Sequence, residues 1–258
     1  MVTGMMPLDL ARTVQGDGPV LVIAHGLFGS ARNWGVIAKR LSDTRRVVTV
    51  DMRNHGASPW SSEAGYAAMA LDLARVIEGH GGRADLLGHS MGGKAAMQLA
   101  LTRPALLRRL VVADIAPVAY GHSQQHLIDA MRVIGEDHAS RADAEAELAG
   151  YVDDAGVRAF LLQSLDLRER RWRLNLDALE DHMDALVGWP GTPGRFEGPA
   201  LFLTGAESDY VRPEHRGPIR EQFPAARFAR IPGAGHWLHA ERPREFEAAV
   251  RVFLDRAA

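Results

Sequence analysis

Cysteine is absent from the 258 residues, which excludes a disulfide framework and any metal site built on thiolates. The chain also has no large excess of acidic or basic residues, with 32 Asp and Glu against 30 Lys and Arg. The formal net charge of −2 gives no electrostatic case for nucleic acid or an anionic membrane as the main partner. No apolar run reaches the roughly 20 residues that a membrane-spanning helix needs. Residues 1–12 contain no basic segment followed by an apolar core, so we expect a cytoplasmic protein without a secretory signal.

Several cofactor-binding patterns are missing as well. The chain contains no H-E-x-x-H pair, no G-x-G-x-x-G fingerprint and no P-loop, so we expect neither a metal nor a nucleotide cofactor. Internal repeats and low-complexity segments are absent too. The hydrophobic content of 47% is ordinary for a globular protein, and the length fits one large domain or a domain with an insertion.

Short β-branched runs alternate with amphipathic stretches along most of the chain. This alternation is typical of an α/β protein in which helices flank a mostly parallel central sheet. The expected strands cover residues 20–24, 46–50, 84–87, 110–113, 200–204 and 226–231. The expected helices cover residues 36–41, 66–78, 94–101 and 243–254.

The pattern changes after Pro117. The segment up to about Pro199 is charged and poor in β-branched runs, and it has helical patterns at 122–135, 142–151 and 156–165. It is too long for a plain loop in a compact sheet. We therefore expect a core domain of residues 1–116 and 196–258, with residues 117–195 forming a helical cap over the strand ends, where ligands of such sheets bind.

A G-x-S-x-G pattern follows the expected strand 84–87, with Gly88, Ser90 and Gly92 at the fixed positions. A chance match is common, but here a strand precedes the pattern and a helix follows it. That context is typical of a nucleophile elbow, where a strained turn presents a serine at a helix N-terminus. The sequence predicts Ser90 as a nucleophile.

A serine nucleophile needs a base, and the base needs an acid that holds its tautomer. We favour His236 as the base, because it lies in a glycine-rich loop after the last expected strand, whereas His239 leads into the final helix. The acid has two candidates, Asp114 and Asp209, each of which follows a strand. Glu207 shares the loop of Asp209. Each of these carboxylates could instead be a helix cap or a turn residue.

Backbone N–H groups are expected to hold the oxyanion. One belongs to the residue after the nucleophile, Met91, and the other to the loop after the first core strand. In that loop Leu27 is the preferred donor and Phe28 the alternative. His25, His55 and His89 each sit in a turn beside glycine, where we expect their rings to tie neighbouring loops together.

Together these residues resemble the α/β-hydrolase family along essentially the whole chain. More narrowly, the chain is similar to the YbfF-type esterases and the ABHD11-type hydrolases. The runs that carry this narrower resemblance are HGLFGS (25–30), NW (33–34), DMRNHG (51–56), SP (58–59), GHSMGGK (88–94), DIAPV (114–118) and GAGHW (233–237). The resemblance implies a nucleophile at Ser90, a base at His236 and an acid at Asp114, while Asp209 stays a rival acid.

The resulting expectation is a serine carboxylesterase that cleaves small to medium acyl esters through an acyl-enzyme and needs no cofactor. Trp237, Phe28 and Tyr210 are expected to line its substrate pocket. An acyl-CoA thioesterase, whose cap arginines would hold the phosphates, is the close alternative. A cofactor-free perhydrolase and a C–C hydrolase also keep the serine. A non-catalytic ligand-binding protein of the same fold is the remaining alternative.

Overall fold

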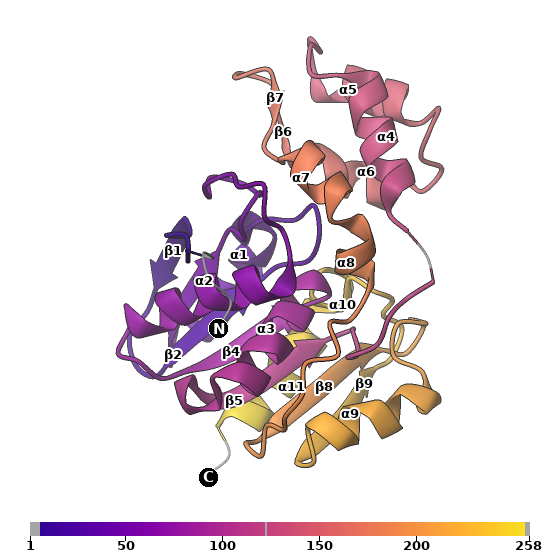
Figure 1. The fold of residues 1–258 in the computed structure, drawn as a ribbon. Helices are drawn as coiled ribbons and strands as arrows, with labels where there is room; N and C mark the ends of the chain where they lie inside the picture. Colours follow the sequence, from indigo (N-terminus) through magenta and orange to yellow (C-terminus); the bar gives the residue numbers. More distant parts are fainter. Residues whose placement is uncertain (1–5, 122, 256–258) are drawn as a thin grey trace.

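The computed structural model describes residues 6–121 and 123–255. Its centre is a seven-stranded sheet in the order β1-β3-β2-β4-β5-β8-β9 (Figure 1). β1 pairs antiparallel with β3, and all other neighbours in this sheet pair in parallel. The strands are β1 (Arg12–Gln15), β2 (Val20–Ala24), β3 (Arg46–Val50), β4 (Ala84–His89), β5 (Leu107–Ala113), β8 (Ala200–Gly205) and β9 (Ala226–Ile231).

Strand burial explains why the sequence predicted the central strands well. Every residue of β2, β4 and β8 is buried, as expected when helices cover both faces of a parallel sheet. The short edge strand β1 is mostly exposed, and the sequence did not predict it. The expected mostly parallel α/β sheet is confirmed.

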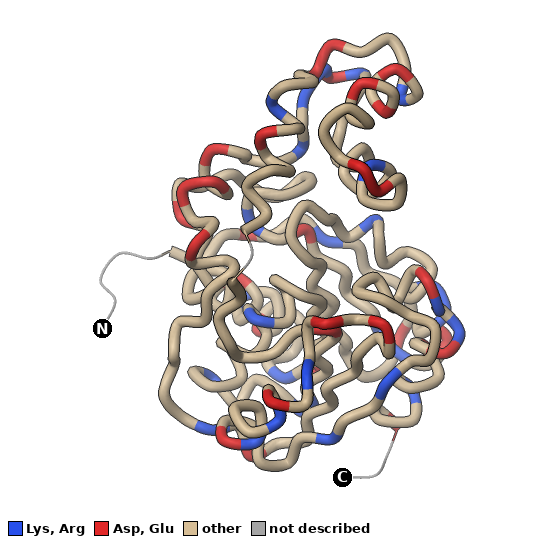
Figure 2. The backbone as a smooth tube through the Cα atoms, turned by 90° about the vertical axis from the view of Figure 1, so that its right-hand side faces the viewer, with Lys and Arg blue, Asp and Glu red and all other residues tan. Residues whose placement is uncertain are grey.

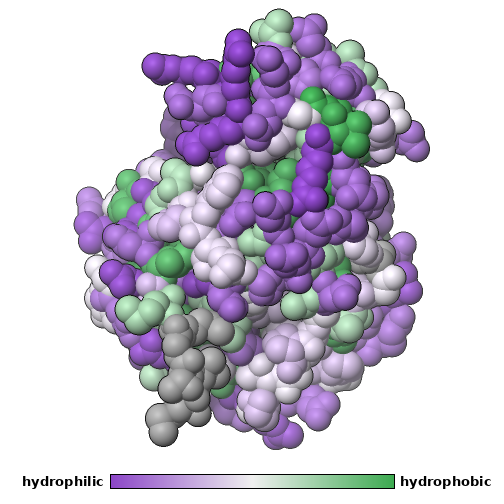
Figure 3. Space-filling model, turned by 45° about the horizontal axis from the view of Figure 1, so that its top comes forward, coloured by the Kyte–Doolittle hydropathy of each residue, from purple (hydrophilic) through white to green (hydrophobic). Residues whose placement is uncertain are grey.

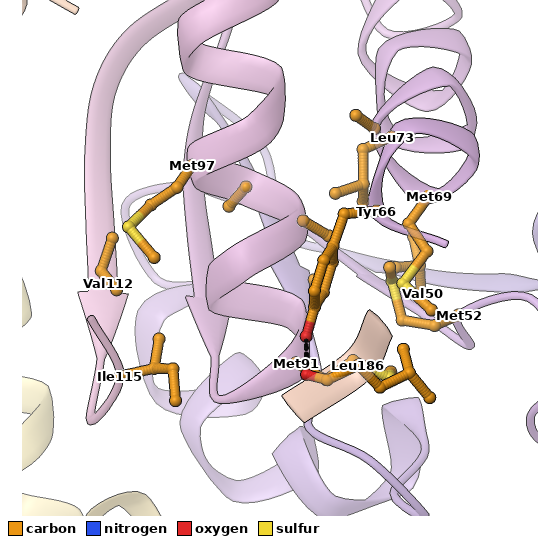
Figure 4. Close-up of a cluster of buried hydrophobic side chains, with 14 of the residues drawn as sticks. Val50, Met52, Tyr66, Met69, Leu73, Met91, Met97, Val112, Ile115 and Leu186 are labelled. Atoms are coloured by element: carbon orange, nitrogen blue, oxygen red, sulfur yellow. Dashed lines mark hydrogen bonds between the residues drawn. The ribbon is translucent and has the colours of Figure 1, made fainter. Parts of the chain in front are cut away.

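Helices pack on both faces because neighbouring strand residues point in opposite directions. In β2, Val20, Val22 and Ala24 belong to one core cluster, whereas Leu21 and Ile23 belong to the other. The first cluster includes residues of α2 (Tyr66–Glu78), α3 (Met91–Thr102) and α9 (Arg216–Gln222), and Figure 4 shows part of it between α2 and α3. The second includes residues of α1 (Gly35–Leu41), α10 (Leu238–Glu241) and α11 (Pro243–Leu254). The 3-10 helices cover Ala31–Trp34, Pro104–Leu106 and Pro213–His215.

The chain leaves the sheet after β5 and returns at β8, and this insertion stands at the top of Figure 1. It contains α4 (Gln125–Ile134), α5 (Arg141–Leu148), α6 (Ala155–Leu162), α7 (Leu176–Asp181), α8 (Met183–Val187) and a hairpin of β6 (Leu165–Asp166) with β7 (Arg171–Trp172). Acidic and basic residues are interspersed along the insertion (Figure 2). A helical insertion was predicted, but the hairpin was not. Residue 122, where the first predicted helix begins, lies outside the described residues.

Side-chain caps define several helix starts in the insertion. Ser140, Asp154 and Asn175 precede α5, α6 and α7, and each side chain accepts the N–H of the third residue after it. Within residues 6–121 and 123–255, no helix is both long and apolar enough to cross a membrane. The cytoplasmic location stays a prediction, as does the division into residues 1–116, 117–195 and 196–258.

Candidate active site

Ser90 lies in a tight turn between β4 and α3, and its φ of +51° is rare for a residue with a side chain. Glycines make the turn possible. A Cβ on Gly88 would lie 2.2 Å from the carbonyl oxygen of Gly92. A Cβ on Gly92 would lie 2.5 Å from the carbonyl oxygens of Ala24 and His25. The glycine spacing that the sequence showed therefore has a steric cause in this turn.

His236 lies in the loop between β9 and α10, and its Nδ1 is 2.8 Å from Oδ2 of Asp114. Asp114 is completely buried where β5 ends, with a φ of +51°. Its Oδ1 accepts the N–H of Gly205 at 3.1 Å. The structure thus brings the preferred acid to the preferred base, while Asp209 is exposed to solvent.

A serine that the sequence reading missed also reaches this carboxylate. The hydroxyl of Ser208 donates to Oδ2 of Asp114, and its Oγ accepts the N–H of Tyr210 at 3.2 Å. The sequence offered one signal, since Ser208 stands between the two acids considered in the same loop. The sequence analysis considered only carboxylates in this loop. Ser208 and Asp114 are more than ninety residues apart in the chain, so no local sequence pattern connects them.

Aromatic rings enclose His236. The ring of Tyr210 stacks on it with centroids 3.9 Å apart, and the ring of His89 lies 4.7 Å away. Nε2 of His89 donates to the backbone carbonyl of His236 at 2.8 Å, which ties the His236 loop to the turn that holds Ser90. Burial holds the pKa of His89 well below its usual value, so this ring is neutral.

Two other buried histidines tie loops together, as the sequence predicted. Nε2 of His25 accepts the N–H of Met52 at 2.9 Å, and Nε2 of His55 accepts the N–H of Phe28 at 3.1 Å. Burial lowers the pKa of His25 to about 4 and that of His55 to about 3, so both rings are neutral acceptors. His239 instead stacks on the ring of Trp34, with centroids 4.1 Å apart.

A cavity of about 230 Å³ opens above Ser90, between the sheet and the insertion. The predicted pocket residues Trp237, Phe28 and Tyr210 line it, as do Leu27 and Met91. The insertion supplies the remaining walls through Tyr120, Gln124, Leu127, Val157, Phe160, Leu186 and Val187. Hydrophobic residues gather where the insertion meets the core (Figure 3). The lining is therefore mostly apolar, although it includes Asn33, Lys94 and Gln124 besides the polar groups near Ser90.

The amine of Lys94 is buried beside this cavity, one helical turn after Ser90. Its Nζ donates to the carbonyls of Val187, at 2.9 Å, and Gly188, at the end of α8. The ring of Tyr120 lies 4.7 Å away, and burial lowers the pKa of Lys94 to about 7. The hydroxyl of Tyr66 donates to the neighbouring carbonyl of Leu186 (Figure 4). These bonds hold the end of the insertion against the core.

No group of three or more His, Asp or Glu side chains that could hold a metal ion is found in the part of the chain that the structure describes. The polar groups around Ser90 are suited to proton transfer, because a buried carboxylate orients the imidazole of His236, which lines the same cavity as Ser90. A neutral imidazole held in this way accepts a proton at its other nitrogen.

The chain belongs to the alpha/beta hydrolase family, whose model matches residues 21–249. It is 43% identical to the mouse protein named sn-1-specific diacylglycerol lipase ABHD11, over 97% of this chain and 86% of that protein. It is 40% identical to Esterase YbfF of Escherichia coli K12, over 93% of this chain and 95% of that protein. A solved structure described as a marine microorganism esterase is 37% identical, with a TM-score of 0.91 over 95% of this chain and 99% of that one. The protein is therefore a hydrolase of the esterase and lipase class.

Proposed function

We propose that this hydrolase is a serine carboxylesterase that cleaves small to medium acyl esters through an acyl-enzyme intermediate. Ser90 is the nucleophile, His236 the base and Asp114 the acid. The observation that carries the proposal is the 2.8 Å contact between His236 Nδ1 and the buried carboxylate of Asp114, beside a cavity that Ser90 lines. The esterases and lipases among the relatives support the same chemistry.

In the proposed mechanism the ionised Asp114 accepts a hydrogen bond from the Nδ1–H of His236, which keeps the proton on Nδ1 and leaves Nε2 with a free lone pair. Nε2 takes the Ser90 proton as Oγ attacks the ester carbonyl. The imidazolium then gives this proton to the alkoxide as the alcohol leaves, and Ser90 stays acylated. A water molecule repeats the sequence, which releases the carboxylic acid and restores the hydroxyl of Ser90.

Two backbone N–H groups hold the oxyanion in this proposal. Met91 is the first residue of α3, where an N–H has no partner inside the helix. The second donor is Leu27 rather than Phe28, because the Phe28 N–H already donates to His55. The cavity lining is mostly apolar, which suits an acyl chain that lies under a cap of residues 117–195.

Acyl-CoA thioester hydrolysis is a second candidate, and a separate cavity favours it. That cavity has a volume of about 640 Å³, and Arg32, Arg141, Arg168 and Arg173 are among its lining residues. It adjoins the loop after β2, which also lines the Ser90 cavity. Arg173 is paired with Asp166 in this cavity, and Arg141 donates to the carbonyl of Leu162. The exposed guanidinium groups of Arg32 and Arg168 are therefore the ones suited to phosphates of a large leaving group.

The test is a panel of p-nitrophenyl esters and acyl-CoA thioesters of graded chain length, measured with wild type and Ser90→Ala. We expect ester turnover to fall by at least ~10³-fold in Ser90→Ala, since the remaining groups give only residual catalysis. Near-wild-type ester turnover by this variant would reject the proposed nucleophile. A higher kcat/KM for thioesters than for esters of equal chain length would favour the second candidate.

A further inference from the structure

The turn that carries Leu27 is held in a strained conformation. Residues 26–29 form a turn in which the N–H of Gly29 donates to the carbonyl of Gly26 at 3.0 Å. Phe28 occupies its third position with a φ of +63°, a region that is strained for a residue with a side chain. Turns with a positive φ at this position normally have glycine there. Such a conformation persists only where its surroundings fix it.

Residues outside the turn hold both backbone polar groups of Phe28, its N–H and its carbonyl. Its N–H donates to Nε2 of His55 at 3.1 Å, and its carbonyl accepts from the hydroxyl of Ser164 at 2.9 Å. Both partners are buried. Nδ1 of His55 lies 2.8 Å from the carbonyl of Arg53, which puts the ring proton on Nδ1 and leaves Nε2 as the acceptor.

Ser164 belongs to the insertion and lies between α6 and β6. Backbone hydrogen bonds through Arg173 link this segment to Gly56 of the core. The carbonyl of Ser164 accepts the N–H of Arg173 at 2.8 Å, and the carbonyl of Arg173 accepts the N–H of Gly56 at 2.8 Å. His55 and Leu174 form an isolated antiparallel bridge next to these bonds. The two groups that hold Phe28 therefore come from the insertion and the core, and they are joined by backbone bonds.

We propose that Ser164 and His55 are positioning residues that hold the Phe28 backbone so that the Leu27 N–H faces the oxyanion. This inference rests on the proposed function, because it assumes that Leu27 is an oxyanion donor. Rotation of the Leu27–Phe28 peptide would relieve the positive φ of Phe28. It would also turn the Phe28 N–H away from His55 and disturb the adjoining peptide that carries the Leu27 N–H. The insertion thus takes part in transition-state stabilisation as well as in enclosing the substrate.

The experiment compares Ser164→Ala with Gln163→Ala. Gln163 also links the insertion to the loop after β2, but through the side chain of Asn33, at 2.7 Å, and not through Phe28. Active sites are first titrated with a fluorophosphonate, so that kcat refers to competent enzyme. KM and kcat are then measured with a p-nitrophenyl ester. The inhibition constant of an alkyl trifluoromethyl ketone is measured as well, because its adduct with Ser90 places an oxyanion in the hole.

We expect Ser164→Ala to lower kcat about 10-fold and to raise the inhibition constant of the ketone by a similar factor, with KM within about twofold. Gln163→Ala is expected to stay within about twofold in all three quantities. Unchanged kcat and ketone inhibition in Ser164→Ala would overturn the inference. So would a loss that disappears once active sites are titrated, because that result indicates a merely structural role.

A second pair of variants tests the core side of the turn. His55→Gln keeps an acceptor oxygen near the position of Nε2, whereas His55→Phe keeps a ring without an acceptor. We expect His55→Phe to lose about 100-fold in kcat and His55→Gln to recover most of that loss. Equal losses in both would overturn the role of His55, and Ser164→Ala decides alone if His55→Phe does not fold. Failure of the proposed function is distinguishable, because Ser90→Ala would then retain turnover.

Discussion

The elbow and the insertion differ in how far their positions depend on side-chain hydrogen bonds. At the elbow the backbone bonds to backbone, since the N–H of Ser90 donates to Ala113 at 3.0 Å and that of Gly92 to His25 at 3.1 Å. The insertion has backbone bonds to the core at Arg173 and Asn175. Beside the cavity, however, it meets the core through side chains, among them Lys94 and Tyr66 at the end of α8 and Ser164 at Phe28. Backbone bonds survive most substitutions. The position of the nucleophile is therefore robust, whereas single side chains can alter how the insertion covers it.

The largest expected effect is a loss of kcat, and it distinguishes Asp114 from Asp209 as the acid on the core side of the site. We expect Asp114→Asn to lower kcat on the order of 10⁴-fold, because the amide stabilises the wrong His236 tautomer while the geometry is kept. Asp209→Asn is the matched control and should change kcat by less than about threefold, since Asp209 is exposed. Steady-state kinetics on one ester checks both. The reverse ranking would assign the acid to Asp209.

The insertion side is expected to control the acyl chain that is accepted. Phe160 of α6 and Trp237 of the core lie with ring centroids 5.6 Å apart, and both line the cavity. We expect Phe160→Ala and Trp237→Ala each to change the kcat/KM ratio of long to short esters about 10-fold, because a methylene in an apolar pocket has effects of this size.

The control for this pair is Tyr151→Ala, which removes an exposed aromatic ring of the insertion away from the cavity. It should leave chain-length preference unchanged. If Trp237→Ala also left the preference unchanged, Trp237 would have no role in the pocket wall.

The sequence predicted the core and the elbow well because their signals are local. The fully apolar strands and the Gly-x-Ser-x-Gly spacing each report a constraint within a few residues, such as the close approach of Gly88 to Gly92. It also favoured Asp114 over Asp209, but through family resemblance. Spacing alone left both acids open, because each follows a strand at the same edge of the sheet.

The contacts that the sequence did not predict are long-range and depend on side chains. Ser208 bonds Asp114, Ser164 bonds Phe28, and Lys94 bonds the end of α8. In each pair the partners are far apart in the chain, so no periodicity connects them. In the sequence, Lys94 stands out only as the last residue of GHSMGGK, one of the segments that carry the family resemblance. The β6–β7 hairpin was missed because its strands have two residues each.

The last expected effect is on stability, and it concerns the core. His25, His55, His89 and His239 are buried, and burial lowers the pKa of each, to about 3 for His239. Their unfolded-state pKa is near 6.5. Above pH 6.5 these histidines are mostly neutral in the unfolded chain as well as in the folded one, so they take nothing from the free energy of unfolding. As the pH falls below about 6.5, stability is lost at up to about 1.4 kcal/mol per pH unit for each histidine.

We therefore expect the urea midpoint at pH 5.5 to lie below that at pH 7.5. His239→Phe replaces one of these rings by another aromatic ring against Trp34. It should reduce the pH dependence between these values by about one histidine's share. An unchanged dependence would mean that His239 is protonated in the folded state.

Covalent labelling tests most directly whether Ser90 is an activated nucleophile. Wild type is incubated with a fluorophosphonate, and the intact mass and the labelled peptide are determined. We predict one phosphonyl group per chain, on the peptide that contains Ser90, and no label on Ser90→Ala. Full labelling of Ser90→Ala, or a label on another residue of the wild type, would contradict the account.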